Sequence, residues 1–188
     1  STITLNEQQL NAFNLIKKFT NSKQHNMLLM GPAGTGKTTI ITRALANTTM
    51  RICFCAFTNK AVTVLRNAAQ KAATLNANFC TIHQLLGLEP NPDENNNLNF
   101  TYDPSKQIGI LQYDIIILDE CSTISQDLFR WFNCSIQYAK NRGHHIWAIY
   151  LGDFWQLPPV GENRAVVFAR AKEQHWPVAK LAKVMRVN

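Results

Sequence analysis

The sequence predicts a single α/β domain with a parallel β-sheet that helices cover on both faces. Apolar runs that suit buried strands alternate along the chain with segments that suit helices, and this alternation is typical of parallel sheets. Three of the runs are followed at once by a glycine or a carboxylate, residues that often stand at the open carboxyl ends of such strands. A chain of 188 residues is long enough for one substantial core and marginal for two, so we expect one domain over residues 1–188.

The first half of the chain holds three expected helices and two expected strands. Thr4 and Glu7 have the spacing of a capping box, which favours a helix that begins there and ends near residue 20. Its apolar stripe recurs every three residues at Leu10, Phe13, Ile16 and Phe19. Residues 27–30 form the first expected strand, and a helical segment follows at 40–46. The run 51–57 is almost entirely apolar, which is typical of a strand buried on both faces, and Thr58 can cap the next helix at 60–73.

The second half begins with a short expected strand at 79–81 and a helical turn or two at 82–86. A polar segment follows that cannot bury much surface, and then Leu98–Tyr102 alternates as a strand does. We interpret residues 88–112 as an insertion with a small surface hairpin, although a flexible loop fits these residues equally well. The remaining expected strands are 113–120, 145–151 and 178–181, and the expected helices are 125–141 and 165–173. The core side of the longer helix should carry Leu128, Phe129, Phe132 and Ile136.

Composition narrows the function only slightly. Nineteen Lys and Arg against twelve Asp and Glu give a net charge of +7, which favours a polyanionic partner such as nucleic acid but also fits a merely soluble basic surface. No apolar run approaches the ~18 residues of a membrane span, and Ser1–Thr4 does not resemble a signal peptide, so we expect no membrane partner.

The cysteines favour a reducing compartment. They are odd in number and form no C-x-x-C pair, so we interpret them as small core residues and not as disulfides or metal ligands. The expected location is inside the cell, in the cytoplasm or in the host of a virus, and a nuclear location stays open. The five residues are Cys53, Cys55, Cys80, Cys121 and Cys134.

Residues Gly31 to Thr38 read G-x-x-x-x-G-K-T, which is the phosphate-binding loop, or P-loop. Its glycines let backbone N–H groups turn toward phosphate oxygens, and the helix after Gly36 points its positive end at them. Lys37 would neutralise the β- and γ-phosphates, and the Thr38 hydroxyl would be a Mg²⁺ ligand. A chance glycine-rich turn is the alternative, but the loop lies between a strand-like and a helix-like segment, as the mechanism requires.

Asp119 and Glu120 follow a buried aliphatic strand. Asp119 would bind Mg²⁺, directly or through water, while Glu120 polarises the attacking water. The alternative is a strand that simply ends in solvent. Gly152 and Asp153 end another strand, and because parallel strands bring their carboxyl ends to one edge, we expect these stretches and the P-loop to form one site.

Two further residue types could belong to this chemistry. Gln156 lies in a stretch stiffened by Pro158 and Pro159, where it could detect the γ-phosphate, although an ordinary strand-to-loop junction would look the same. His144 and His145 are adjacent, but no third ligand has a useful spacing for a metal, so we expect them at the entrance of a strand.

With these motifs in order, the chain resembles superfamily 1 DNA helicases of the RecD-like branch, most closely the Dda type, and specifically their first RecA-like domain, 1A. The resemblance covers essentially the whole chain, and its most specific part is Gly-Asp-x-x-Gln-Leu-Pro-Pro together with Asp-Glu-x-Ser. The corresponding segments are 5–9 (the glutamine motif), 31–39 (motif I), 55–61 (Ia), 81–83 (Ib), 119–122 (II), 152–159 (III) and 184–186 (the start of IV).

The resemblance implies ATP and Mg²⁺ as cofactors. Gln9 would read the adenine, Arg186 would act as an arginine finger, and Lys37, Glu120 and Gln156 would be catalytic. The nucleotide would also contact the whole loop, namely Gly31, Pro32, Ala33, Gly34, Thr35, Gly36, Lys37, Thr38 and Thr39.

The resemblance also implies DNA as the partner. Single-stranded DNA would cross motifs Ia and Ib, and a hairpin at 95–102 would meet the duplex junction with Phe100 or Tyr102, although a Phe and a Tyr two residues apart also suit one packed face of a strand. Family strands of motif Ia commonly end Ala-Pro-Thr, and Phe57 replaces that proline here, so it could stack on a base. For His83, a hydrogen-bonding role at the helix start is equally possible. The DNA-contacting residues would be Phe57, Thr58, Asn59, Thr81 and His83.

The resemblance places the second RecA-like domain of the motor outside these residues. We therefore expect a fragment that binds nucleotide, hydrolyses it slowly and unwinds nothing by itself, with 5′-to-3′ movement in the complete protein. The second RecA-like domain and possible single-strand-binding or replication proteins are further expected partners. The rival hypotheses are a P-loop ATPase or GTPase switch that acts on proteins, and a non-enzymatic module that holds nucleic acid or a protein.

Overall fold

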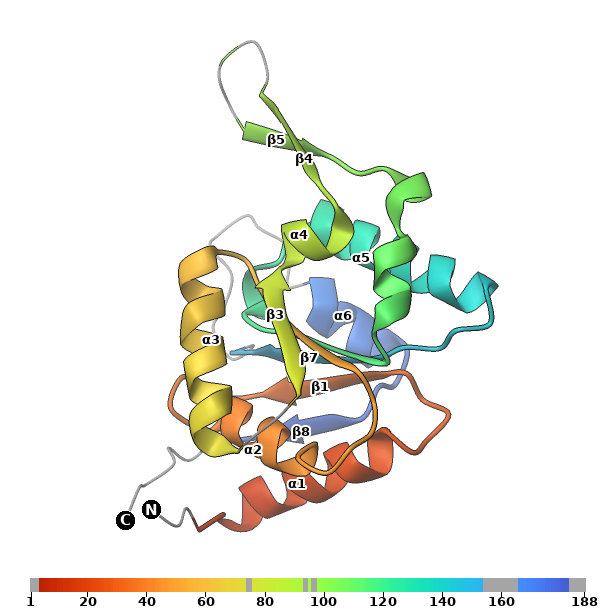
Figure 1. The fold of residues 1–188 in the computed structure, drawn as a ribbon. Helices are drawn as coiled ribbons and strands as arrows, with labels where there is room; N and C mark the ends of the chain where they lie inside the picture. Colours follow the sequence, from red (N-terminus) through yellow and green to blue (C-terminus); the bar gives the residue numbers. More distant parts are fainter. Residues whose placement is uncertain (1–3, 74–75, 93–94, 96–97, 154–165, 183–188) are drawn as a thin grey trace.

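The computed structural model describes residues 4–73, 76–92, 95, 98–153 and 166–182. Six strands form its central sheet in the order β3-β2-β6-β7-β1-β8 (Figure 1), and every neighbouring pair in this sheet is parallel. The strands are β1 (Asn26–Met30), β2 (Ile52–Ala56), β3 (Ala77–Thr81), β6 (Ile115–Leu118), β7 (Trp147–Gly152) and β8 (Val178–Lys180).

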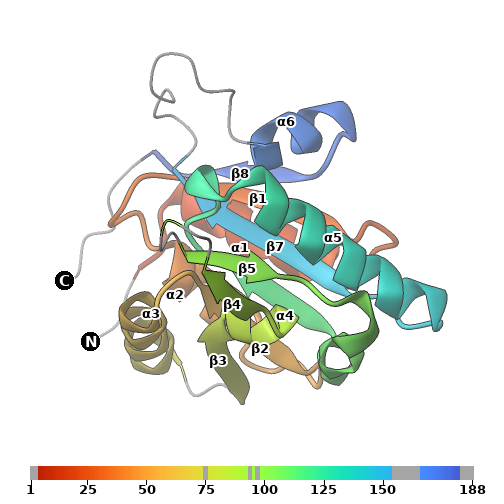
Figure 2. The same cartoon turned by 90° about the horizontal axis from the view of Figure 1, so that it is seen from above.

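Helices cover the sheet on both faces, as the sequence predicts. The helices α1 (Glu7–Phe19), α2 (Lys37–Ala44) and α3 (Asn59–Ala72) pack on one face. The helices α4 (Ile82–Leu86), α5 (Gln126–Asn141) and α6 (Val166–Glu173) pack on the other (Figure 2). The result is the α/β fold of three layers with two apolar cores.

Strand β2 illustrates how the two cores form from one run of sequence. Ile52, Phe54 and Ala56 point into the core beneath α1 to α3, while Cys53 and Cys55 point into the core beneath α4 to α6. All five side chains are buried, because successive residues of a strand face opposite sides and both sides are covered here.

Helix α1 corrects one prediction. The helix begins at Glu7, and its cap is Asn6, whose side chain accepts a hydrogen bond from Gln9 N at 2.9 Å while Asn6 N donates to Gln9 Oε1 at 2.9 Å. The predicted box of Thr4 and Glu7 is therefore wrong, because the reciprocal pair forms two residues later. Leu10 is also 49% exposed, so the apolar stripe is narrower than predicted.

Helix α5 corrects a second detail. Its most buried residues are Phe129, Phe132, Ser135 and Ala139. The predicted core residues Leu128 and Ile136 pack on the same core but are only partly buried. The buried face of α5 carries the small Ser135 and Ala139 instead, and the Ser135 hydroxyl hydrogen-bonds Tyr102 and Gln107. Ser125 caps this helix by accepting from Leu128 N at 3.1 Å.

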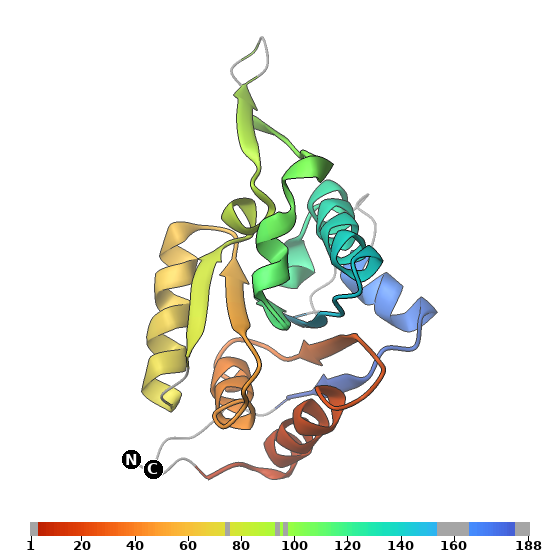
Figure 3. The same cartoon turned by 45° about the vertical axis from the view of Figure 1, so that its right-hand side comes forward.

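The expected insertion contains a hairpin that projects from the body of the molecule (Figures 1 and 3). Its strands β4 (Glu89–Pro92) and β5 (Leu98–Thr101) pair antiparallel. Tyr102 anchors its base to α5, because its ring stacks on Trp131 at 5.9 Å between centroids and its hydroxyl hydrogen-bonds Ser135 at 3.1 Å. Gln107 is buried and donates to the carbonyls of Leu86 at 2.8 Å and Asp103 at 2.9 Å.

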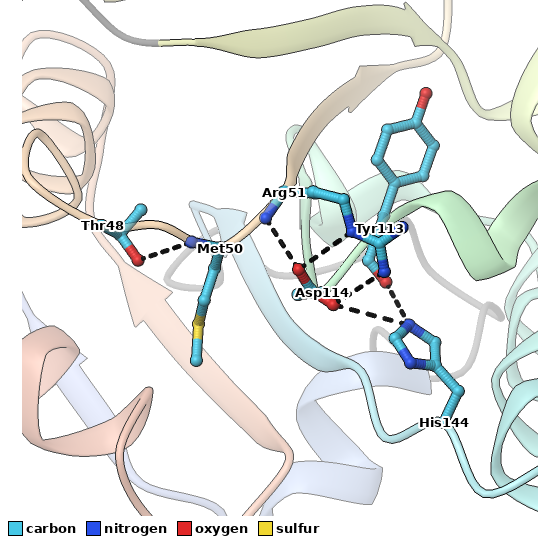
Figure 4. Close-up of polar contacts among 6 residues, drawn as sticks. All are labelled: Thr48, Met50, Arg51, Tyr113, Asp114 and His144. Carbon is cyan, nitrogen blue, oxygen red and sulfur yellow. Dashed lines mark hydrogen bonds and ion pairs between the residues drawn. The ribbon is translucent and has the colours of Figure 1, made fainter.

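Asp114, which lies just before β6, connects the amino end of β6 to the segments that precede β2 and β7 (Figure 4). Its carboxylate accepts from Arg51 N at 2.8 Å, Arg51 Nε at 3.2 Å and Arg51 Nη2 at 3.1 Å. His144 Nε2 lies 3.7 Å from the same carboxylate and 2.7 Å from the carbonyl oxygen of Tyr113. His144 therefore has a structural position at the entrance of β7, as predicted.

Candidate functional site

The three predicted stretches meet at the carboxyl edge of the sheet. The P-loop follows β1, Asp119 and Glu120 follow β6, and Asp153 follows β7, which lies between the other two strands. Gly31 N donates to Gly152 O at 3.0 Å, and Asp119 N donates to Cys55 O at 2.9 Å, so hydrogen bonds between strands extend to the rim of the site.

Two kinds of glycine shape the P-loop. Gly34 has φ of 83° and Gly36 has φ of 85°, a left-handed conformation that side chains disfavour. Gly31 is needed for space, because a Cβ atom there would lie 2.8 Å from the carbonyl oxygen of Leu181. Thr35 is fully buried, and its hydroxyl donates to Pro32 O at 2.8 Å. The remaining loop residues, Ala33, Thr38 and Thr39, are exposed or partly exposed.

Lys37 is the first residue of α2, and its ammonium group points back over the loop. Its Nζ donates to Gly31 O at 2.6 Å and to Pro32 O at 3.0 Å. Burial lowers the pKa of Lys37, while the charges of Asp119, Glu120 and Asp153 act in the opposite direction. The lysine therefore lies within the electrostatic reach of all three carboxylates.

Asp119 and Glu120 differ in their surroundings. Asp119 is largely buried at the end of β6, and its pKa is raised by burial and by the neighbouring Glu120, while Lys37 opposes the rise. Glu120 is exposed and has φ of 59°, a conformation that costs a residue with a side chain of order 1–3 kcal/mol. Glu120 N donates to Asp119 Oδ1 at 2.9 Å, which holds one carboxylate inward beside Lys37 and turns the other toward solvent.

Gln9 is 1% exposed and joins α1 to the P-loop. Its Nε2 donates to Thr35 O at 3.1 Å, while its Oε1 completes the cap of α1 through Asn6 N. The sequence predicts an adenine contact for Gln9. The structure adds a second role, because the hydrogen bond to Thr35 O holds the P-loop against α1.

The donor set fits a triphosphate with a divalent cation. The P-loop and the start of α2 offer backbone N–H groups and the Lys37 ammonium, which suit phosphate oxygens. The Thr38 hydroxyl and the carboxylates of Asp119 and Glu120 are oxygen ligands of the kind that Mg²⁺ prefers. Gln156 and Arg186, the predicted γ-phosphate residues, lie outside the described residues.

The predicted DNA contacts lie at the ends of β2 and β3. Asn59 is exposed beside Thr58, which caps α3 by accepting from Ala61 N at 3.1 Å. Thr81 is only 7% exposed and caps α4 with Gln84, so its side chain is committed to the helix start. Phe57 is half-buried against the core of α4 to α6.

His83 connects motif Ib to the hairpin. Its ring lies 4.5 Å between centroids from the ring of Phe100 on β5, and burial lowers the pKa of His83. Phe57, Thr58 and Asn59 follow β2, while Thr81 and His83 lie at the end of the neighbouring strand β3, so the predicted DNA contacts belong to adjacent strand ends.

Comparison with known proteins decides the family. A family model described as AAA domain matches residues 4–188. The chain belongs to the AAA domain family. This AAA domain is 32% identical over 197 residues to uncharacterized protein R530 of Acanthamoeba polyphaga mimivirus, covering 97% of this chain and 39% of that protein. It is 31% identical over 192 residues to the ATP-dependent DNA helicase dda of Enterobacteria phage T4, covering 98% of this chain and 40% of the relative.

A solved structure supports the same fold. Pif1 of Bacteroides sp in complex with ADP-AlF4 superposes on this AAA domain with a TM-score of 0.62 at 20% identity, covering 100% of this chain and 44% of the other. These findings confirm the resemblance to superfamily 1 helicases and the RecA-like α/β fold. The AAA domain spans 39% and 40% of the lengths of the two curated relatives. None of the described helices has the length and apolar character that crossing a membrane requires.

Proposed function

We propose that this chain is the N-terminal motor domain, 1A, of an ATP-dependent DNA helicase that hydrolyses ATP with Mg²⁺ and moves along single-stranded DNA. The observation that carries the proposal is the meeting of Lys37, Asp119 and Glu120 at the carboxyl edge of one parallel sheet. The sequence likeness to an ATP-dependent DNA helicase over 98% of the chain supports it.

Each side chain has a role that follows from its surroundings. Lys37 balances phosphate charge, because its ammonium group lies over the loop that would cradle the phosphates. The Thr38 hydroxyl and the inward Asp119 carboxylate would hold Mg²⁺, which when bound neutralises charge on the β- and γ-phosphates. Glu120 faces solvent and would orient the attacking water and accept its proton. Gln156 and Arg186 would sense and stabilise the γ-phosphate.

The DNA strand would cross the ends of β2 and β3. Phe57, Thr58, Asn59 and His83 lie there, with Thr81 beneath them, and contacts of this kind position a strand without reading its sequence. The hairpin of the insertion, which we assign as a 1B-type element, would face the duplex junction. Movement in the 5′-to-3′ direction needs a second RecA-like domain that closes on the nucleotide, and replication or single-strand-binding proteins are candidate partners.

The test is the DNA-stimulated ATPase of the full-length protein with Lys37→Ala. The substitution removes the loop ammonium, so stimulated hydrolysis should fall by ~100-fold or more. Lys23→Ala is the matched control. Lys23 is exposed in the connection that leads into the amino end of β1, at the edge of the sheet opposite the P-loop, so this variant should retain wild-type activity. Stimulated hydrolysis that survives Lys37→Ala would favour a module that holds DNA or a protein without acting as a motor.

A nucleotide panel distinguishes the remaining rival, a GTPase-like switch. The sequence has no Asn-Lys-x-Asp guanine motif, and Gln9, which hydrogen-bonds the loop at Thr35 O, would read the adenine. Isothermal titration calorimetry should therefore give tighter binding of ATP than of GTP. A preference for GTP would contradict the proposal.

A further inference from the structure

Three thiols meet on the face of the sheet beneath α4 to α6. Cys53 and Cys55 are two residues apart on β2, so they share a face, and Cys80 is the register partner of Cys55 on β3. The Sγ–Sγ separations are 3.6 Å for Cys53 and Cys55, 3.5 Å for Cys53 and Cys80, and 3.8 Å for Cys55 and Cys80. All five cysteines of the chain are free thiols.

These separations match those of thiolates around one metal ion. Bonds from sulfur to metal of about 2.3 Å at tetrahedral angles place two sulfur atoms about 3.8 Å apart, and a trigonal plane widens this only slightly. The three sulfurs therefore need to move by only a few tenths of an ångström to share an ion. A disulfide is less well matched for the two pairs that include Cys53, because Cys53 and Cys55 are two residues apart on one extended strand, and Cys53 is diagonal to Cys80. Cys55 and Cys80 are register partners, but their sulfurs lie 3.8 Å apart, well beyond the ~2.05 Å of a disulfide bond.

The surroundings of the thiols are apolar on one side and polar on the other. Cys53 and Cys55 are fully buried, whereas Cys80 is partly exposed on the edge strand β3. The Tyr113 hydroxyl acts on the pKa of Cys53 and accepts from Asn78 Nδ2 at 2.9 Å. Tyr113 and Asn78 also line a surface hollow of about 700 Å³, and the partial exposure of Cys80 opens the cluster to solvent.

The electrostatics of Cys80 favour a ligand role. Hydrogen bonds with the Cys53 thiol and with the Cys55 thiol lower the pKa of Cys80, although its burial acts against this. The pKa of Cys53 and that of Cys55 are raised instead, so the negative charge of the cluster is concentrated on Cys80. The thiolate is the form of cysteine that binds metals. Within the described part of the chain, the cluster holds these three cysteines and no histidine or carboxylate.

We propose that Cys53, Cys55 and Cys80 form a binding site for a soft, thiophilic metal ion, and that the ion is Cu⁺. Three thiolates suit this soft ion, whereas a closed zinc site needs a fourth protein ligand. On binding, each S–H bond that is still present breaks and its proton passes to solvent, while three S–Cu bonds form; no oxidation occurs. This assignment departs from the sequence interpretation, which took the cysteines as plain core residues.

The position of the site gives the ion a structural consequence. Cys55 lies two residues before Phe57, and Cys80 directly precedes Thr81. A bound ion would therefore hold the edge strand β3 against β2, next to the strand ends that we propose contact DNA. The metal site itself does not depend on that function, because it rests on the three sulfur positions alone.

The first test needs no substitution. The reduced, metal-free chain is treated with one equivalent of Cu⁺ under anaerobic conditions and then with iodoacetamide, and alkylation is mapped by peptide mass spectrometry. Cu⁺ should protect Cys80 and leave Cys134 reactive, since Cys134 is exposed on α5 outside the cluster. Equal alkylation of Cys80 with and without Cu⁺ would overturn the proposal.

The second test measures affinity by competition with a colorimetric Cu⁺ chelator. The wild-type chain should withdraw one equivalent of Cu⁺ from the chelator, and Cys80→Ser should lose this capacity. Cys134→Ser is the matched control and should keep it. Circular dichroism establishes that each variant is folded. One equivalent retained by a folded Cys80→Ser, or lost in a folded Cys134→Ser, would show that the ion lies elsewhere.

Discussion

Gly31→Ala tests whether the P-loop is held in register by its packing against the end of β8. A Cβ atom on residue 31 would lie 2.8 Å from Leu181 O, 2.8 Å from Thr35 Oγ1 and 3.0 Å from Leu181 Cβ. Neither neighbour yields easily. Leu181 N donates to Met30 O at 2.8 Å, and the buried Thr35 hydroxyl donates to Pro32 O at 2.8 Å. The added methyl group must therefore displace either β8 or the loop.

The expected cost follows from this overpacking. One extra carbon atom in a closely packed region destabilises by about 1–3 kcal/mol, and about 2 kcal/mol corresponds to a fall of roughly 4–8 °C in Tm for a chain of this length. The affinity for ATP should fall by tenfold or more, because misplacing a site by ~1 Å can cost up to ~100-fold. Differential scanning fluorimetry and calorimetry measure the two effects.

The matched control is Gly109→Ala. Residue 109 is a glycine whose added Cβ would meet only Gln112 Nε2, at 3.7 Å, which is ordinary contact. Its Tm should stay within about 2 °C of wild type, as expected for a change of ~0.5 kcal/mol or less. If the Gly31→Ala and Gly109→Ala variants have the same Tm and the same affinity for ATP, the steric reasoning about the loop is wrong.

Three further predictions concern polar groups. Asp114→Ala should cost about 1–2 kcal/mol, whereas Asp127→Ala should cost under ~0.5 kcal/mol because its pair with Arg130 is exposed. Burial raises the pKa of Asp114, but Arg51 outweighs it and the net pKa is lowered. The stabilisation by the Asp114 carboxylate is therefore present above about pH 4. In acid melting curves it should disappear as pH falls through the lowered pKa. Gln107→Ala should lower Tm by roughly 2–10 °C, since it leaves buried partners unpaired; an unchanged Tm would contradict this. Asp119→Asn should raise Tm at pH 7 while abolishing ATPase, because burial disfavours the ionised carboxylate; a lower Tm would refute this account.

The features that sequence could predict are those encoded within a few consecutive residues. The P-loop lies between a strand and a helix, and Asp119 directly follows four aliphatic residues, so each motif fixes its own place at the end of a strand. The parallel sheet then brings the motifs to one edge without any knowledge of side-chain contacts. This is why Lys37, Asp119 and Glu120 could be assigned to one site before the strand order was known.

The features that sequence could not predict depend on contacts between distant segments. Nothing near Gly31 indicates that Leu181 limits its size, and the hydrogen bond from Gln9 to Thr35 joins residues far apart in sequence. The thiol cluster does not have the C-x-x-C spacing of a turn, because Cys53-Phe54-Cys55 lies on a strand that points both sulfurs to one face. The strand period of two could have placed Cys53 and Cys55 on one face. The position of Cys80 beside them could not be predicted, because it depends on the pairing of β2 with β3.

The electrostatics of the nucleotide site explain why stability and function should oppose each other there. Burial disfavours the charged forms of both Lys37 and Asp119, as the lowered pKa of the lysine and the raised pKa of the carboxylate indicate. Lys37 is partly compensated by the carbonyls of Gly31 and Pro32. A phosphate that takes Lys37 as its counterion replaces those carbonyls with a full negative charge, and a divalent cation does the same for Asp119. The folded chain thus carries an unfavourable charge arrangement that a metal–triphosphate would relieve, and part of the binding energy arises from this relief.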